Sequence, residues 1–122
     1  MELTIESILR RGIAYHREGN VQEAERLYRS ILQAHPQHPD ANHNLGVLAT
    51  GVGQVEAAIP FFKAALEANP KIEQFWLSYI DALTKLKKVD EARVLLGQAK
   101  SHGVSSEKLK QLEGQLSSSP KA

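Results

Sequence analysis

The sequence lacks several residue types and patterns that build particular kinds of site. It contains no cysteine, one methionine and one tryptophan in 122 residues. The absence of cysteine excludes a disulfide framework and thiolate metal ligands, and it is typical of a reducing compartment. No apolar run approaches the ~20 residues that span a bilayer. The opening stretch MELTIESILRRG carries acidic residues, which targeting segments avoid. We therefore expect a cytoplasmic protein.

Excess charge of one sign is also absent. The chain has 15 basic and 14 acidic residues, which gives a formal net charge of +1. A nearly neutral protein produces no overall field that attracts nucleic acid or an anionic membrane, so we expect neither as a partner. A chain of this length is the size of one domain with one continuous core.

The most informative feature of the sequence is an internal repeat. Ala24, Ala58 and Ala92 are separated by 34 residues each, and the same offset joins four further pairs of positions. These pairs are Gly12 and Gly46, Gly19 and Gly53, Tyr28 and Phe62, and Pro36 and Pro70. A fixed period of this length indicates a stacked-repeat architecture, in which one unit alone cannot bury its apolar face.

The middle copy, residues 39–72, indicates which structural unit is repeated. Residues 44–49 are compatible with a helix, a glycine-rich break follows at residues 51–54, and apolar residues then recur at helical spacing. Asn69 precedes a proline and therefore disfavours helical dihedral angles, which ends the unit. Each copy is predicted to be a helical hairpin.

The residues shared by the copies resemble the tetratricopeptide repeat pattern. In the middle copy they are Leu45, Gly46, Ala58, Phe62, Ala65 and Pro70. The first copy departs from the pattern at Arg11, and the third at Ile80 and Val104. The resemblance implies an all-α fold, a right-handed superhelix of three antiparallel helix-turn-helix repeats plus a capping helix, with seven helices. It also implies one domain over residues 1–116, with repeats at residues 5–38, 39–72 and 73–106.

The remaining residues predict a capping helix at residues 105–116 and a disordered tail at residues 117–122. Ser105 is the predicted N-cap, and Leu109, Leu112 and Leu116 form one apolar stripe. This stripe would cover the apolar side of the last repeat, and the opposite face carries Lys, Gln and Glu.

Glycine inside a helix requires an explanation, because it is about 1 kcal/mol less favourable there than alanine. Gly12 and Gly46 fall in the middle of predicted first helices, so we expect close approach by a neighbouring helix. The repeated alanines would let the two helices of each hairpin lie against one another, while Tyr28 and Phe62 would fill the space between hairpins. Trp76 is predicted to be buried in the third copy.

No residue pattern in the sequence predicts catalysis or a cofactor. His35, His38 and His43 are close enough in sequence to be considered as metal ligands, but no carboxylate or cysteine stands at a spacing typical of metal sites. No nucleophile elbow, phosphate-binding loop or pair of catalytic carboxylates is present. We predict no enzyme activity, metal or cofactor, and interpret these histidines as turn or groove residues.

Stacked helical hairpins usually bind ligands on a concave wall formed by the first helix of each repeat. Helical phase places the following residues on that wall: Leu9, Arg10, Ile13, His16, Arg17, Asp40, His43, Asn44, Val47, Thr50, Gln74, Leu77, Ser78, Asp81, Thr84 and Lys85. The mixture of apolar and polar side chains suits an extended or helical peptide, with apolar anchors for affinity and polar groups that bind backbone or carboxylate.

Two further resemblances bear on the ligand. Family members that clamp a C-terminal carboxylate use Lys, Asn and Arg at inner positions, of which only Asn44 matches here, so the resemblance disfavours such a clamp. The segment DANHNLG also resembles bacterial repeats that precede glycosyltransferase domains, where an asparagine equivalent to Asn44 recurs along the groove. Arg10 and Ser78 interrupt that series here.

The main functional prediction is a protein-interaction module that binds a peptide or protein segment in its groove, as a monomer or weak homodimer. The alternative is the amino-terminal, substrate-recruiting segment of a larger enzyme such as a glycosyltransferase. RNA binding is less favoured, because the basic residues do not line one face.

Overall fold

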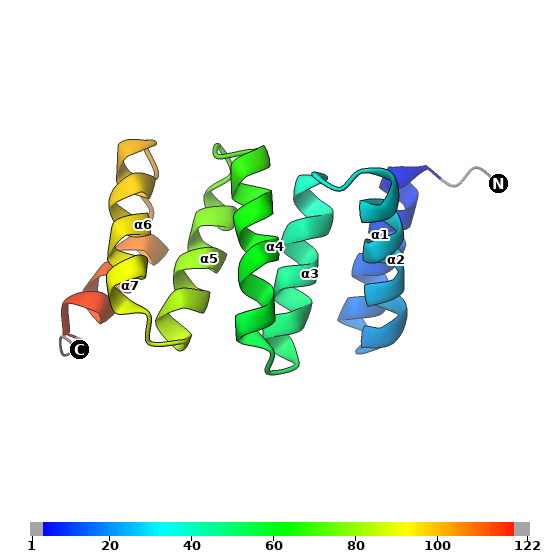
Figure 1. Ribbon diagram of the computed structural model, residues 1–122, viewed down its shortest axis with the longest axis horizontal. Coiled ribbons are helices and arrows are strands. Elements are labelled where there is room, and N and C mark those ends of the chain that lie inside the picture. Colours follow the sequence, from blue (N-terminus) through cyan, green and yellow to red (C-terminus); the bar gives the residue numbers. More distant parts are fainter. Residues whose placement is uncertain (1–3, 119–122) are drawn as a thin grey trace.

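The computed structural model describes residues 4–118, which form seven α-helices and no strand. The helices are α1 (Ile5–Arg17), α2 (Val21–Ala34), α3 (Pro39–Gly51), α4 (Val55–Ala68), α5 (Glu73–Lys85), α6 (Val89–Ser101) and α7 (Glu107–Ser118). They stand in one row, with α1 at one end and α7 at the other (Figure 1). The predicted all-α repeat fold is confirmed. None of the helices in the described part is long and apolar enough to cross a membrane.

A large ring packs against a glycine inside each of the first two hairpins. A Cβ atom added to Gly12 would lie 2.7 Å from Cε1 of Tyr28, and one added to Gly46 would lie 2.5 Å from Cε1 of Phe62. Close-packed interiors leave no room for such a contact, so the missing side chain is what admits the ring. The predicted close approach of a neighbouring helix to each glycine is confirmed. The rings of Tyr28 and Phe62 were expected only between hairpins, but each packs inside its own hairpin and also against the next one.

The third hairpin packs through different residues, and its two helices lie less close together than those of the first two hairpins. Ile80 stands where Gly12 and Gly46 stand, and Leu96 stands where the ring is in the earlier copies. Both side chains are buried in the same core cluster. This pair fills more space than a glycine with a ring, and fewer Cα atoms of α5 and α6 approach one another within 8 Å than in the first two hairpins.

The other predicted packing residues are buried as expected. Ala24, Ala58 and Ala92 are each 0% exposed. Trp76 is 3% exposed, and its Nε1 donates a hydrogen bond to the Pro70 carbonyl oxygen at 2.7 Å. The indole is therefore held by both apolar burial and a satisfied polar atom.

Local residues account for where α1 begins, where α3 ends and how α4 continues. Thr4 caps α1, because its Oγ1 accepts a hydrogen bond from the Ser7 amide at 3.0 Å. Helix α3 includes Gly51, which the sequence placed in the following break. Pro60 lies inside α4, which continues through it from Val55 to Ala68.

The capping helix begins later than predicted. Ser106, not Ser105, supplies the cap, because its Oγ accepts a hydrogen bond from the Leu109 amide at 3.2 Å and α7 starts at Glu107. Ser117 and Ser118, which the prediction assigned to the tail, lie within this helix, which ends two residues beyond the predicted bound at residue 116. The rest of the predicted tail, residues 119–122, lies outside the described part of the chain.

The predicted apolar stripe of α7 is confirmed. Leu109, Leu112 and Leu116 are all buried in the cluster that contains the third hairpin. Two polar contacts from α6 hold the helix in place: Arg93 donates to the Leu116 carbonyl at 2.7 Å, and Lys100 pairs with Glu113.

The turn inside each hairpin needs one residue in the left-handed region. Gly19 and Gly53 have φ angles of 83° and 84°, and Lys87 occupies the equivalent place in the third hairpin with φ 61°. The following amide donates back across each turn, from Asn20 to the Tyr15 carbonyl at 2.8 Å and from Lys88 to the Leu83 carbonyl at 2.9 Å. The third hairpin therefore keeps the turn geometry without the residue best suited to it.

Substitution of Gly46 tests the ring-on-glycine packing. We expect Gly46→Ala to lower the free energy of unfolding by on the order of 1–2 kcal/mol, because overpacking exceeds the gain in helix propensity. Gly97→Ala is the matched control, since a Cβ there meets nothing within 4 Å. The control should raise stability by about 0.5–1 kcal/mol. Urea denaturation measures both, and equal stabilisation by the two variants would contradict the packing role.

Lys87→Gly tests the turn. A left-handed conformation is unfavourable for an L-residue by roughly 1–2 kcal/mol, part of which the greater entropy of unfolded glycine offsets. We expect a net stabilisation of about 0.5–1 kcal/mol, measured by thermal unfolding. Gly53→Ala should shift stability in the opposite direction, and a destabilised Lys87→Gly protein would refute the argument.

Candidate functional site

The first helices of the three hairpins form the narrower side of the stack. Cα atoms of α1 approach those of α3, and those of α3 approach α5, to within 8 Å, whereas no such approach joins α2 to α4 or α4 to α6 in the described helices. The side formed by α1, α3 and α5 is therefore concave, and we call it the concave face. The residues predicted for the binding groove lie on these three helices.

The concave face presents its predicted residues to very different degrees. Arg10, Arg17, Asp40, Gln74 and Lys85 are exposed, and Val47 is an exposed apolar side chain at 38%. The half-buried members are Leu9, Ile13, His16, Asn44, Thr50, Ser78, Asp81 and Thr84. Two predicted groove residues are buried: His43 is 9% exposed and Leu77 is 6% exposed. These two contribute to the floor by packing and offer little surface to a ligand.

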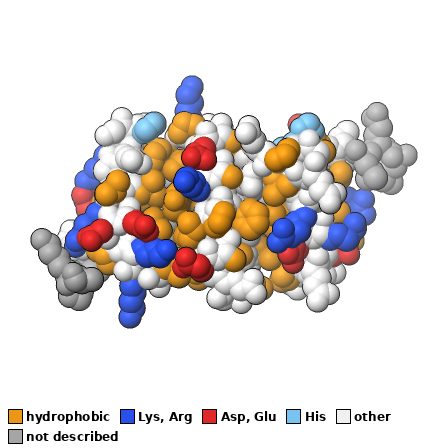
Figure 2. Space-filling view, viewed as in Figure 1, with side chains coloured by type: hydrophobic (Ala, Val, Ile, Leu, Met, Phe, Trp, Pro, Cys, Tyr) orange, Lys and Arg blue, Asp and Glu red, His pale blue; other side chains and the backbone are white. Residues whose placement is uncertain are grey.

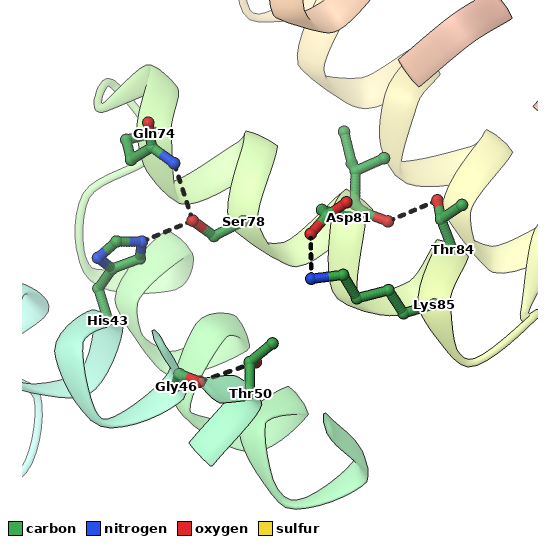
Figure 3. Close-up of polar contacts among 9 residues, drawn as sticks. His43, Gly46, Thr50, Gln74, Ser78, Asp81, Thr84 and Lys85 are labelled. Carbon is green, nitrogen blue, oxygen red and sulfur yellow. Dashed lines mark hydrogen bonds and ion pairs between the residues drawn. The ribbon is translucent and has the colours of Figure 1, made fainter. Parts of the chain in front are cut away.

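His43 joins the second and third hairpins. Its Nε2 lies 2.8 Å from Oγ of Ser78, which also accepts a hydrogen bond from Nε2 of Gln74 at 3.0 Å (Figure 3). Its ring packs between Phe62 and Phe75, with centroid distances of 5.6 Å and 4.9 Å. The structure thus brings together three predicted groove residues, but as a contact between hairpins.

Other polar groups on the concave face are satisfied within their own helices. Lys85 pairs with Asp81 at 3.1 Å, and Oγ1 of Thr50 donates to the Gly46 carbonyl at 2.9 Å (Figure 3). Oγ1 of Thr84 likewise donates to the Ile80 carbonyl at 2.8 Å. Such local contacts leave the side chains accessible without fixing their direction toward a ligand.

A recess of about 500 Å³ lies between α1 and α3 at one end of the concave face. It is lined by Ile13, His16, Arg17, Asn44 and Tyr28, so four of the predicted residues meet here. The Tyr28 hydroxyl is buried and has no hydrogen-bond partner among the described residues. Burial raises the pKa of Tyr28, which keeps the hydroxyl protonated. Sequence reasoning treated Tyr28 only as a packing residue.

A second recess of about 290 Å³ separates α5 from α7. Gln74, Leu77, Ser78 and Asp81 line one wall, and the other wall consists of α7 residues Lys108, Gln111, Leu112 and Gln115. The sequence placed the polar residues of α7 on the face opposite its leucine stripe. Helical phase did show which side of α7 is polar, but not that this side borders the concave face.

The described residues contain no group of three or more His, Cys, Asp or Glu side chains that could hold a metal ion. His35 and His38 line a shallow recess in the connector between α2 and α3, and Nδ1 of His38 accepts from the Ala41 amide at 3.1 Å. His38 therefore caps α3, while His43 lies on the concave face. The structure places the three histidines in separate roles.

Comparison with known protein families identifies the repeat. One tetratricopeptide repeat family model matches residues 9–71, and a second matches residues 49–116. The chain belongs to the tetratricopeptide repeat family. Neither match concerns glycosyltransferase domains, so the resemblance of the middle repeat to sequences preceding such domains stays a prediction.

Solved structures share the fold of this tetratricopeptide repeat chain. The first TPR of Spaghetti (RPAP3) bound to the HSP90 peptide SRMEEVD is 17% identical, with a TM-score of 0.83, and the match covers 93% of this chain and 90% of that one. The TPR2B domain of yeast Sti1 in its pHsp70 complex is 18% identical, with a TM-score of 0.83, covering 93% and 95%. MamA of AMB-1 is 24% identical, with a TM-score of 0.79, covering 93% and 62%.

The buried imidazole makes stability depend on pH. Desolvation lowers the pKa of His43, and this effect exceeds the opposing influence of the Asn44 hydrogen bond and the Asp40 charge. The folded state therefore favours the neutral ring, while the unfolded chain takes up a proton at about pH 6.5. Stability should fall as the pH decreases below that value, because the unfolded state binds the proton at a higher pH than the folded state does.

We expect this decrease to be smaller in His43→Gln, which cannot titrate. Denaturant unfolding at pH 7.5 and pH 5.5 measures the difference, with His35→Gln at an exposed position as the control. An identical pH dependence in wild type and His43→Gln would show that His43 is not responsible.

Proposed function

We propose that the concave face binds a peptide segment of a partner protein and that the chain carries out no chemistry of its own. The observation that carries this proposal is the arrangement of Leu9, Ile13 and Val47, which offer apolar surface between exposed or half-buried polar side chains such as Arg10 and Asn44. Apolar anchors favour affinity, and polar groups around them can bind a peptide backbone.

The open part of the proposed groove lies over the first two repeats. Leu77 is buried in the cluster that includes the α7 leucines, and His43 and Ser78 bind each other. The recess at Ile13, His16, Arg17 and Asn44 is lined by hydrogen-bond donors and one guanidinium. An extended or helical segment that carries an acceptor group, such as a carbonyl or carboxylate, suits these residues.

Two similar folds support peptide binding as the mode of action. The RPAP3 domain is bound to an HSP90 peptide, and the Sti1 domain is in a pHsp70 complex. We extend only the general mode to this chain, because its identity to both is below 20%. The proposed partner is a protein or peptide, and neither nucleic acid nor a membrane is proposed. We propose that the chain itself is a monomer or a weak homodimer.

The test uses a peptide array to select binding segments, followed by titration calorimetry. We expect Asn44→Ala and Val47→Glu to weaken binding of a selected peptide at least tenfold, since one removes a polar group and the other places a charge on the apolar floor. Gln22→Glu, an exposed position on α2, is the control and should bind like wild type. Wild-type affinity in both groove variants would overturn the proposal.

A further inference from the structure

A hollow of about 520 Å³ lies on the side opposite the concave face, between α4, α5 and α6. We call it the convex hollow. Its apolar lining consists of Ile59, Tyr79, Leu83, Val94 and Leu95. Figure 2 shows hydrophobic side chains gathered between α4 and α6, with charged side chains of both signs around them. Val94 is 62% exposed, which makes it the most exposed large hydrophobic side chain in the described part of the chain.

The preceding junction between repeats shows what fills the equivalent space. Phe61 of α4 packs against the core of the first two hairpins, and the guanidinium carbon of Arg29 lies 5.8 Å from its ring centroid. The residue 34 positions after Phe61 is Leu95, and the residue 34 positions after Arg29 is Lys63. Lys63 lines the convex hollow. The second junction therefore keeps a cation, Lys63, but has the isobutyl group of Leu95 where the first junction has the aromatic ring of Phe61.

Tyr79 does not close this space. It stands where Leu45 is in the second repeat, and it forms one wall of the hollow. Desolvation and the charges of Glu91 and Glu67 raise the pKa of Tyr79, so its hydroxyl remains a donor beside them. The ring is half-buried and packed on the core clusters on both sides.

Lys63 lies toward one end of the hollow, and Lys88, Asp90 and Glu91 lie toward the other. Lys63 lies in the second half of α4, whereas Asp90 and Glu91 begin α6, and the two helices run in the same direction (Figure 1). Lys88 is paired with Glu56 at 3.2 Å, and Asp90 with Arg93 at 3.9 Å. Within residues 4–118, Lys63 and Glu91 make no ion pair. A segment with one basic and one acidic residue would complement these ends.

We propose that the convex hollow is a docking site for a partner protein segment that inserts one aromatic side chain. The inserted ring would occupy the space that Phe61 occupies at the other junction, with Lys63 over it as Arg29 lies over Phe61. A basic residue of the segment would lie toward Asp90 and Glu91, and an acidic one toward Lys63. This site is on the opposite side from the proposed peptide groove and is independent of it.

The experiment is a titration of ¹⁵N-labelled protein, followed by NMR, with the peptide Ac-Lys-Gly-Phe-Gly-Asp-NH₂ as the probe. The matched control peptide has leucine in place of phenylalanine. We expect amide shifts at Tyr79, Val94 and Leu95, with a dissociation constant at least fivefold lower for the phenylalanine peptide. Equal affinity for the two peptides, or shifts confined to other residues, would overturn the proposal.

Two variants locate the site. Leu95→Phe places a ring from the chain itself at the position that Phe61 has at the other junction. We expect this variant to bind the phenylalanine peptide at least tenfold more weakly, while its circular dichroism spectrum stays unchanged. Val94→Glu changes an exposed rim position and should weaken binding as well, so it decides the matter if Leu95→Phe fails to fold. Val47→Glu, on the concave face, should have no effect on this titration.

Self-association is a separate outcome. If the same amides shift with protein concentration in the absence of peptide, a second copy of the chain occupies the hollow and the proposed partner is wrong. A folded Leu95→Phe protein that binds the phenylalanine peptide as wild type does would likewise refute the proposal.

Discussion

The contact between an aromatic ring and a glycine inside a hairpin is the constraint on which the rest of the structure depends. Gly12 and Gly46 each leave the space that one ring fills, and the rings of Tyr28 and Phe62 also reach the neighbouring core residues. Because interiors are close-packed, this exchange of volume sets how near the two helices of a hairpin can lie. The third hairpin has the buried pair Ile80 and Leu96 instead, and its two helices approach one another less closely.

The spacing within the hairpins leads to the shape of the stack. The first helices approach one another while the second helices do not, so one face is concave and the other is opened between repeats. His43 connects the second and third hairpins, because its ring packs on Phe62 and its Nε2 is hydrogen-bonded to Ser78. The same side chain therefore supports the core and forms part of the floor of the concave face.

Substitutions between repeats give each junction its own surface. On the concave side, Leu77 is buried with the α7 leucines, so the third repeat presents less free surface than the first two. On the convex side, Leu95 in place of a ring leaves a hollow that Phe61 fills one repeat earlier. A repeat architecture thus allows distinct surfaces to arise from residue changes at equivalent positions.

The sequence alone determined the helical hairpins, their period and the burial of the small and aromatic positions, because a 34-residue offset and helical spacing are local properties. Only the tertiary structure decided which inner residues remain accessible. His43 and Leu77 share the helical phase of the open positions, yet contacts with Ser78 and the α7 cluster bury them. The docking of α7 likewise decides that the helix starts at Glu107 and that its polar side lies next to the concave face. Such features arise from contacts between residues far apart in the chain, which periodicity does not encode.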